Sequence, residues 1–344
     1  MENLTSLSQE AIFFHMASLR YTSPVNCDVD VKLSSIEGKT AIVTGGRHFM
    51  RVQMDLERHM YGPFSKQGNA DENGSRYLTS NTNILSRATV VIADLDNDGG
   101  LKLEKEAKFV NCDTSNWDDQ DRLFQEAVSF SPTEKIHYVV ANAGIHRKDE
   151  VFAYAGDGNG PKKPDLSTIN VNLVGTLYTA KLASHYFIKQ NGQQPSPSQE
   201  DTCLIMIGSG AAFLDCPRAP QYCATKWAMR GIMHSLRRTA FYYGSRVNVI
   251  SPWYVKTNIL SEETFAHVES VGVQVAEASD AGQCLLRILG DSAVNGRSIF
   301  VSGRKWSSRG FLDLDIDDYP KGSLIESIQE DQIKPAPVEL GLFI

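Results

Sequence analysis

Residues Cys203 to Lys226 read CLIMIGSGAAFLDCPRAPQYCATK and combine a strand signal with the start of a helix. The run Cys203–Ile207 is apolar at every position, which is typical of a strand buried on both faces. It is followed by a glycine and Ser209, small residues that favour a turn at the edge of a sheet. Tyr222 and Lys226 are four residues apart, so on a helix they project from the same face. The stretch therefore predicts a strand, a turn and a helix of an α/β sheet.

Six further apolar runs have the same character, and each ends on small or polar residues. They cover residues 39–44, 88–93, 108–112, 136–141, 246–250 and 298–301. Helix-like segments lie between them, notably 170–189 and 222–243. Strands that are apolar on both faces and alternate with helices indicate a parallel sheet covered on both sides. We therefore expect an α/β fold with a doubly wound, seven-stranded parallel sheet in a single domain.

The expected domain spans residues 36–310, with an N-terminal extension at 1–35 and a C-terminal tail at 311–344. Residues 47–87 form an atypical segment inside the domain, because much of it is rich in Gly, Asn and Ser and lacks a clear period. The tail begins with the acidic stretch FLDLDIDDYP, a pattern that is typical of a solvated appendage.

Composition excludes several classes of protein. The formal net charge of -7 argues against a general nucleic-acid binder or a protein of anionic membrane surfaces. The six cysteines are scattered, with no Cys-x-x-Cys pair and no His/Cys cluster, so we expect a reducing compartment and no metal site. No apolar run approaches the about 18 residues of a membrane span. The sequence predicts a cytoplasmic protein.

Polar residues follow the predicted strands at the point where each strand ends. In a doubly wound sheet the ligand binds outside the carboxyl ends of the strands. Asp94 and Asp113 are placed to reach a nucleotide there, and Asn142, Ser209 and Thr257 to line a crevice. The alternative for each is that it only forms a turn or caps a helix.

Ser209, Tyr222 and Lys226 form the candidate catalytic set. An ammonium near a phenol favours the phenolate, so a tyrosine with an ordinary pKa of about 10 can exchange a proton nearer to neutral pH. A hydroxyl from Ser209 at the strand end is positioned to hold a substrate oxygen against that phenol. The alternative is that Tyr222 and Lys226 are an ordinary pair on a helix surface.

Together these residues resemble the short-chain dehydrogenase/reductase family over residues 36–303, which implies a Rossmann-type sheet. Tyr222 and Lys226 match its Tyr-x-x-x-Lys motif, and Ser209 has the family's spacing to that tyrosine. The sequence Asn142-Ala143-Gly144 matches the family's Asn-Ala-Gly. Within the family, the chain looks most like the fungal polyketide-pathway alcohol dehydrogenases of the hydroxyaverantin dehydrogenase type and the hydroxyprostaglandin dehydrogenases.

Three further matches lie outside these motifs. Asn172 matches the helix asparagine that completes the family's catalytic tetrad. The segment from Pro252 to Thr257, which includes Val255, matches Pro-Gly-x-Val-x-Thr, but Trp253 replaces the glycine. Asp113 matches the acidic residue beside the adenine.

The resemblance implies a role for each member of the tetrad. Tyr222 is the general acid/base at the reacting oxygen, and Ser209 fixes that oxygen. Lys226 lowers the pKa of the tyrosine and holds the nicotinamide ribose, and Asn172 holds a water that links the lysine to solvent. The cofactor-binding set is expected to comprise Gly45, Gly46, Asp94, Asp113, Asn142, Gly144, Tyr222, Lys226, Val255 and Thr257. We expect NAD as cofactor, with NADP as the alternative, because Asp94 is placed to meet the adenosine ribose.

One departure affects the first turn. The family reads Thr-Gly-x-x-x-Gly-x-Gly there, and the glycines let backbone approach the pyrophosphate. In this chain Gly45 and Gly46 are present, but residues 47–51 are Arg-His-Phe-Met-Arg and the later glycines are absent. We therefore expect weakened dinucleotide binding.

Two functions remain open at this point. The first is an NAD(P)-dependent oxidoreductase that interconverts a secondary alcohol and a ketone on a hydrophobic small molecule, in secondary metabolism. The second is a non-catalytic relative with impaired cofactor binding that acts as a scaffold or binds a partner. We expect a homo-oligomer that binds a small-molecule alcohol or ketone and neither nucleic acid nor membrane.

Overall fold

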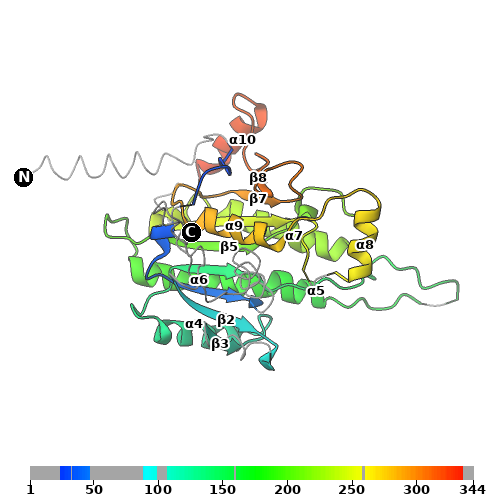
Figure 1. Cartoon of the computed structure of the whole chain (residues 1–344), viewed down its shortest axis with the longest axis horizontal. Helices are drawn as coiled ribbons and strands as arrows, with labels where there is room; N and C mark the ends of the chain where they lie inside the picture. Colours follow the sequence, from blue (N-terminus) through cyan, green and yellow to red (C-terminus); the bar gives the residue numbers. More distant parts are fainter. Residues whose placement is uncertain are drawn as a thin grey trace, which may run out of the picture.

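The computed structural model describes residues 24–31, 33–46, 88–98, 107–158, 160–257 and 260–335. A single sheet runs through these residues in the order β3-β2-β1-β4-β5-β6-β7-β8 (Figure 1). Its strands are β1 Thr40–Thr44, β2 Thr89–Asp94, β3 Lys108–Asn111, β4 Tyr138–Ala141, β5 Thr202–Ile207, β6 Ser245–Pro252, β7 Ser298–Val301 and β8 Phe311–Asp313. Strands β1 to β7 are parallel, so the predicted doubly wound α/β sheet is confirmed.

Two predictions were wrong at the C-terminal end of the domain. The sheet has an eighth strand where seven were predicted, and the chain from residue 311 packs on the domain where a solvated tail was predicted. Strand β8 pairs antiparallel with β7, with Phe311 opposite Val301. The side chain of Phe311 is buried, and so is that of Asp317 just beyond the strand. Asp317 is buried and pairs with Arg230, and the carboxylates of Asp313, Asp315 and Asp318 lie near Arg297. The charge pattern of the sequence does not reveal these ion pairs.

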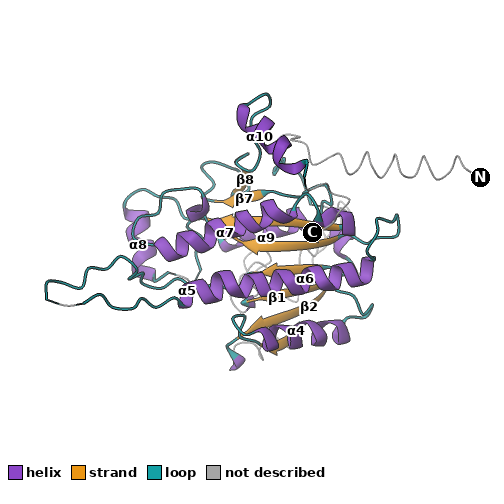
Figure 2. Ribbon diagram, turned by 180° about the vertical axis from the view of Figure 1, so that it is seen from behind, coloured by secondary structure: helices purple, strands orange, loops and turns teal. Residues whose placement is uncertain are grey.

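Helices cover both faces of the sheet. One face carries α4 (Trp117–Phe130), α6 (Gly175–Asn191) and α7 (Pro220–Leu236), which Figure 2 shows in front of the strands. The other carries α9 (Ala278–Leu289) and the short 3-10 helix η1 (Leu33–Ile36). The remaining elements are α5 Ser167–Ile169, the π-turn η3 Asn170–Val174, the 3-10 helices η4 Gly210–Ala212 and η5 Ala240–Tyr243, α8 Glu262–Ser270 and α10 Leu324–Ile333.

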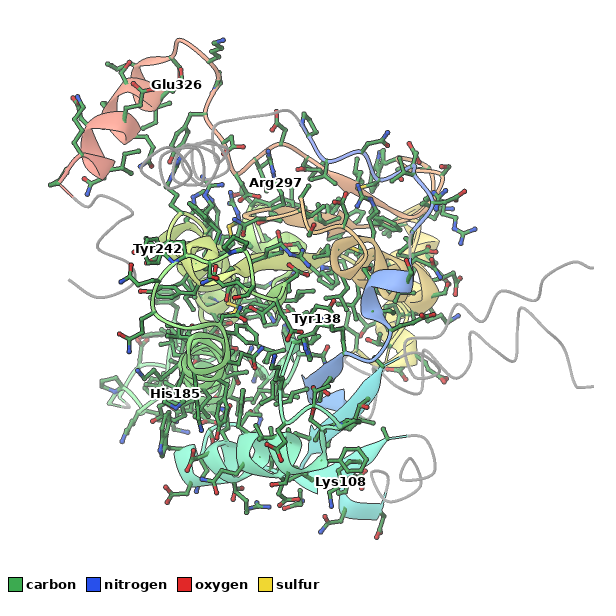
Figure 3. The ribbon with its side chains drawn as sticks, turned by 90° about the vertical axis from the view of Figure 1, so that its left-hand side faces the viewer. Lys108, Tyr138, His185, Tyr242, Arg297 and Glu326 are labelled. Atoms are coloured by element: carbon green, nitrogen blue, oxygen red, sulfur yellow. The ribbon has the colours of Figure 1, made fainter. Side chains whose placement is uncertain are left out.

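The two layers of helix pack on alternate residues of the strands. Ile42 and Val91 belong to the apolar cluster that includes α4, α6 and α7. Val43 and Ile92, their neighbours along the strands, belong to the cluster that includes α9. In Figure 3, Tyr138 of β4 lies in the middle of the molecule, and its side chain is fully buried. Each such large apolar side chain contributes about 1.5–3 kcal/mol on burial, so the sheet is a rigid base for the loops at its strand ends.

None of the helices in the described part of the chain is long and apolar enough to cross a membrane.

Candidate active site

The candidate catalytic residues gather at the carboxyl ends of β4 and β5. Ser209 follows β5, and its oxygen caps η4 by accepting a hydrogen bond from the Ala211 N–H at 3.2 Å. Helix α7 begins at Pro220, and a proline in the first turn of a helix costs no backbone hydrogen bond. This helix carries Tyr222 and Lys226 one turn apart, with the Lys226 Nζ 5.5 Å from the centre of the Tyr222 ring. Ser209 and Tyr222 are hydrogen-bonding neighbours.

Lys226 is a buried amine. Only 6% of its surface is exposed, and its Nζ donates a hydrogen bond to the Ile207 carbonyl at 2.8 Å. Burial lowers the pKa of Lys226 to about 8, because removal from water disfavours the charged form. The amine can therefore change its charge near the pH at which a cell works.

The pKa of Tyr222 differs in direction from the expectation. Burial raises it above its ordinary value of 10.0, and the hydrogen bond with Ser209 lowers it only in part. Lys226 is not among the causes of this shift, and its amino group donates to the Ile207 carbonyl; the predicted lowering of the tyrosine pKa by Lys226 stays a prediction. Tyr222 is thus held as a neutral phenol, the form that can donate a proton.

Asn172 positions the segment that follows β4. Its Oδ1 accepts from the Ile145 N–H at 2.8 Å, and its Nδ2 donates to the Ile145 carbonyl at 2.9 Å. It lies in the π-turn before α6, where its own carbonyl accepts from the Thr176 hydroxyl at 2.8 Å. The described contacts therefore assign the Asn172 side chain a positioning role, and the water link to Lys226 stays a prediction.

His146 lies beside Tyr222 although it belongs to no motif in the sequence. Its ring meets the Tyr222 ring edge to face, with centroids 4.9 Å apart and planes at 81°. Asn172 fixes the chain one residue before it, through Ile145. The only signal in the sequence was its place two residues after Gly144.

The turn after β1 is tied to the end of β4. Asn142 Nδ2 donates to the carbonyls of Thr44 at 3.0 Å and Gly45 at 2.8 Å. Gly45 has φ +60°, and a Cβ there would lie 2.6 Å from the Ala143 Cα. A Cβ on Gly46 would lie 2.5 Å from an Ile92 methyl group. Both glycines are required by close packing, and Asn142 holds the turn with its side chain.

Of the other predicted cofactor residues, Asp94, Val255 and Thr257 lie at or just after strand ends, whereas the side chain of Asp113 forms a local turn. Asp94 ends β2 beside this turn, and its Oδ1 accepts from the Asp96 N–H at 3.2 Å. Val255 follows β6 and is buried where it pairs with Ala276, and Thr257 lies two residues further on. The Asp113 carboxylate accepts from the Ser115 N–H at 2.9 Å and hydroxyl at 2.7 Å, so here it forms a turn.

The residues at the lysine end fit a nicotinamide ribose. Lys226 is buried with its amine held by one carbonyl, although an ammonium has three donors. Gly144 lacks the Cβ that would lie 3.8 Å from the Lys226 Nζ, which leaves space beside the amine. Residues 47–87, which were predicted to affect the phosphate end of the site, lie outside the described residues. Within the described ranges, no group of three His, Cys, Asp or Glu side chains could hold a metal.

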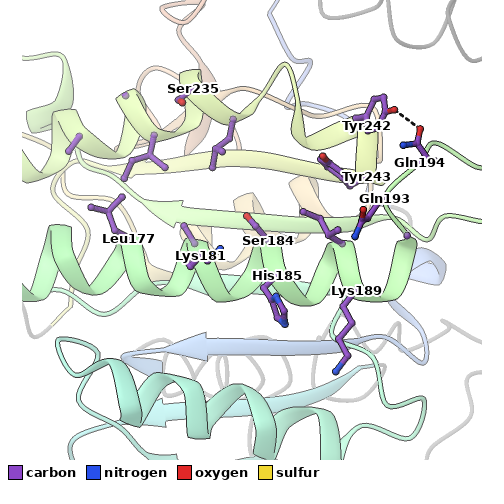
Figure 4. A pocket seen from close by; sticks show the side chains of 17 residues that line it. Leu177, Lys181, Ser184, His185, Lys189, Gln193, Gln194, Ser235, Tyr242 and Tyr243 are labelled. Atoms are coloured by element: carbon purple, nitrogen blue, oxygen red, sulfur yellow. Dashed lines mark hydrogen bonds between the residues drawn. The ribbon is translucent and has the colours of Figure 1, made fainter. Parts of the chain in front are cut away.

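A separate groove of about 1230 Å³ lies between α6 and α7, on the outer side of the helices (Figure 4). It is lined by Leu177, Lys181 and His185 of α6 and by Ile232 of α7, and Tyr242 at one end donates to Gln194 at 2.8 Å. None of the predicted catalytic residues lines it, so size alone does not identify the reactive site.

Comparisons with known proteins agree with this geometry. Residues 77–266 match the family model described as short chain dehydrogenase. An NADP-dependent dehydrogenase of Cochliobolus lunatus, clz5, is 29% identical over 81% of this chain and 93% of that protein. The 5'-hydroxyaverantin dehydrogenase of Dothistroma septosporum is 27% identical over 68% of this chain and 72% of that protein. A 3-ketoacyl-(acyl-carrier-protein) reductase of Brucella melitensis, complexed with NADH, shares the fold with TM-score 0.58 and 20% identity, covering 78% of this chain and 98% of that one.

Proposed function

Because the chain belongs to the short-chain dehydrogenase/reductase family, we propose that it is an NAD(P)-dependent oxidoreductase that interconverts a secondary alcohol and a ketone. The observation that carries the proposal is Lys226, a buried amine one helical turn from Tyr222 and beside Ser209. We further propose a hydrophobic small-molecule substrate of secondary metabolism, because fungal dehydrogenases are among the relatives.

Three side chains would handle the oxygen and its proton. In the direction of reduction, the Ser209 hydroxyl donates a hydrogen bond to the substrate oxygen and the Tyr222 hydroxyl donates its proton to the same oxygen. In the direction of oxidation the phenolate form of Tyr222 would accept that proton, and the positive charge of Lys226 would favour that form. When bound, the nicotinamide supplies or takes the hydride.

The same residues would hold the cofactor. Lys226 would bind the nicotinamide ribose, and Gly45, Gly46 and Gly144 would leave room for the dinucleotide. Asp94 lies beside the turn after β1, where a carboxylate can accept from the ribose hydroxyls and repel a 2′-phosphate. We therefore propose NAD over NADP, and tighter binding of NADPH than of NADH would overturn this choice.

The proposed partners are a small-molecule alcohol or ketone and a second copy of the chain, in the cytoplasm. The groove between α6 and α7 has an apolar floor that includes Ile232, and Leu177 at its wall is 46% exposed. Light scattering after gel filtration tests the oligomer directly.

The deciding experiment compares wild type with Tyr222→Phe. We expect Tyr222→Phe to bind NADH as wild type does and to lose turnover by the roughly 10²–10⁴-fold typical of a general acid–base group. Cofactor binding is followed by nucleotide fluorescence and turnover by absorbance of the reduced nicotinamide. Comparable turnover in the two proteins would remove Tyr222 from the mechanism.

The rival function, a non-catalytic relative, rests on residues 47–87, which lie outside the described residues. The same titration separates the two functions, because a scaffold has no need of a dinucleotide. If wild type binds neither NADH nor NADPH, the oxidoreductase proposal fails.

A further inference from the structure

Five aromatic side chains form a continuous tract at the carboxyl edge of the sheet, beside the catalytic serine. We call this tract the aromatic wall; it consists of Phe213, Trp253, Tyr254, Phe300 and Trp306. Phe213 follows β5, Trp253 and Tyr254 follow β6, Phe300 lies in β7 and Trp306 follows β7. The wall therefore comes from three neighbouring strand ends, the edge at which α/β proteins bind ligands.

The rings contact one another in sequence along the wall. Trp253 lies 5.0 Å from Tyr254, 5.3 Å from Trp306 and 6.3 Å from Phe300 between ring centroids. Phe213 meets Phe300 edge to face at 5.4 Å. All of these separations fall in the about 4.5–7 Å range of attractive aromatic pairs. Trp253 is thus the centre of the wall.

Trp253 also brings the wall against the catalytic loop. A Cβ on Gly210, the residue after Ser209, would lie only 2.8 Å from the Trp253 Cδ1. The indole therefore packs directly on the backbone that carries the Ser209 hydroxyl. Trp253 stands at the position where the motif Pro-Gly-x-Val-x-Thr has glycine, so this contact is a property of the present chain.

The wall is anchored at one end and open at the other. Phe300 is 6% exposed, whereas Trp306 is 48% exposed and the neighbouring Leu214 is 42% exposed. Lys305 Nζ lies 4.4 Å from the centre of the Trp306 ring, a cation–π contact that holds the exposed indole in place. The exposed indole of Trp306 is thus braced beside Trp253, the ring that packs on the loop carrying Ser209, and it offers apolar surface to a ligand.

We propose that the aromatic wall binds a flat aromatic ring of the substrate, and that Trp253 and Trp306 determine this selectivity. The inference rests on the proposed function, since the alcohol or ketone borne by that ring would reach Ser209 and Tyr222. A planar ring can stack on or edge against the indoles, whereas a saturated ring of the same carbon skeleton is puckered and lacks the ring quadrupole.

The test is binding of two ketones that differ only in this respect, 2-acetylnaphthalene and 2-acetyldecalin. Equilibrium dialysis is run on the full chain with excess NAD and NADP in their oxidised forms, so that neither ketone is reduced. We compare wild type with Trp306→Leu. The control is Trp227→Leu, because Trp227 on α7 is 52% exposed and has an arginine, Arg230, 5.5 Å from its ring.

We expect wild type and Trp227→Leu to bind the naphthyl ketone about three- to tenfold more tightly than the decalyl ketone, the range that aromatic pairing contributes beyond buried area. Trp306→Leu should lose that preference while binding the decalyl ketone as wild type does. Equal affinity of wild type for the two ketones, binding of neither, or the same preference in both variants overturns the inference.

Turnover with NADH and NADPH is measured separately, so that the two proposals fail in different ways. Selective binding without reduction of either ketone supports the aromatic wall and rejects the oxidoreductase function. Reduction of both ketones with equal kcat/KM, together with equal affinity, supports the function and rejects the aromatic wall.

Discussion

Lys226 is buried, and among the described residues no carboxylate forms an ion pair with its ammonium. Its ammonium donates to the Ile207 carbonyl, and burial lowers its pKa from 10.5 to about 8. Below pH 8 the lysine is charged in both the folded and the unfolded chain, so the fold bears the full desolvation cost. Between pH 8 and 10.5 the folded chain releases its proton first, and this cost disappears as the pH rises.

Lys226→Met should therefore abolish turnover and stabilise the protein at pH 7. A shift from 10.5 to about 8 corresponds to about 3 kcal/mol at 1.36 kcal/mol per pKa unit. The gain should shrink as the pH rises from 8 to 10.5, which urea unfolding at several pH values measures. A variant less stable than wild type at pH 7 would show that the ammonium contributes net favourable contacts.

At the residue scale, the sequence predicted which residues gather at the carboxyl ends of the strands better than it predicted their surroundings. Ser209, Tyr222 and Lys226 could be found because their spacing follows from one turn and one helix. His146 could not be found in this way, because it reaches Tyr222 through the tertiary packing of separate segments. Asn142 was singled out as a residue lining the crevice, whereas its amide holds the turn after β1.

At the scale of elements, the turn after β1 is a tightly constrained connection. Gly45 needs both a left-handed backbone and the absence of a side chain, because Ala143 lies directly against it. Gly38 has a similar φ of +70°, but nothing lies within 4 Å of the Cβ that it lacks. A substitution at Gly38 therefore introduces backbone strain alone, whereas the same substitution at Gly45 introduces both backbone strain and a steric clash.

Gly45→Ala should cost more stability than Gly38→Ala and should also weaken binding of NADH. Strain alone at Gly38 is expected to cost about 1–2 kcal/mol. At Gly45 the clash adds to this, and relief of the clash displaces the turn that Asn142 holds. Urea unfolding and a fluorescence titration measure the two effects. Unchanged NADH affinity in Gly45→Ala would mean that this turn does not contact the cofactor.

The elements themselves were largely predictable, because fully buried strands are apolar at nearly every position. Strand β8 was missed because it is only three residues long, Phe311–Asp313. It opens a stretch in which apolar residues alternate with aspartates, so it contains no continuous apolar run. Residues 47–87 were predicted to be atypical, and they lie outside the described residues. The start of α6 also differs from the expected regular helix, because residues 170–174 form a π-turn that places Asn172.

At the scale of the whole molecule, the N-terminal segment at Val25 and Asn26 contacts the C-terminal part of the domain. The Val25 N–H donates to the Asp313 carboxylate at 2.9 Å, and Arg287 of α9 donates to the Asn26 carbonyl. Both segments were predicted to be extensions of the domain. Contacts between residues nearly three hundred positions apart leave no periodic signal in the sequence.

Asp317 connects this C-terminal segment to α7, the helix that carries Tyr222 and Lys226. Its buried carboxylate accepts from Arg230 and His234 of α7 at 3.1 Å, and from the Ser298 N–H of β7 at 2.7 Å. Burial raises its pKa, but the His234 hydrogen bond and the Arg230 charge outweigh burial, and the net pKa is lowered. Arg230 lies one turn beyond Lys226, so the C-terminal segment holds the helix that carries Tyr222 and Lys226.

Asp317→Asn should destabilise the protein by about 3–5 kcal/mol, because it leaves the Arg230 guanidinium without its buried counter-charge. Asp331→Asn is the matched control: Asp331 pairs with Lys334 at the surface, both side chains are 73% exposed, and such pairs contribute about 0–1 kcal/mol. Thermal unfolding measures both, and turnover below the melting temperature shows whether α7 has shifted. Equal stability of the two variants would mean that the C-terminal segment is an appendage after all. A large loss confined to Asp317→Asn would mean that the catalytic helix depends on residues more than eighty positions further along the chain.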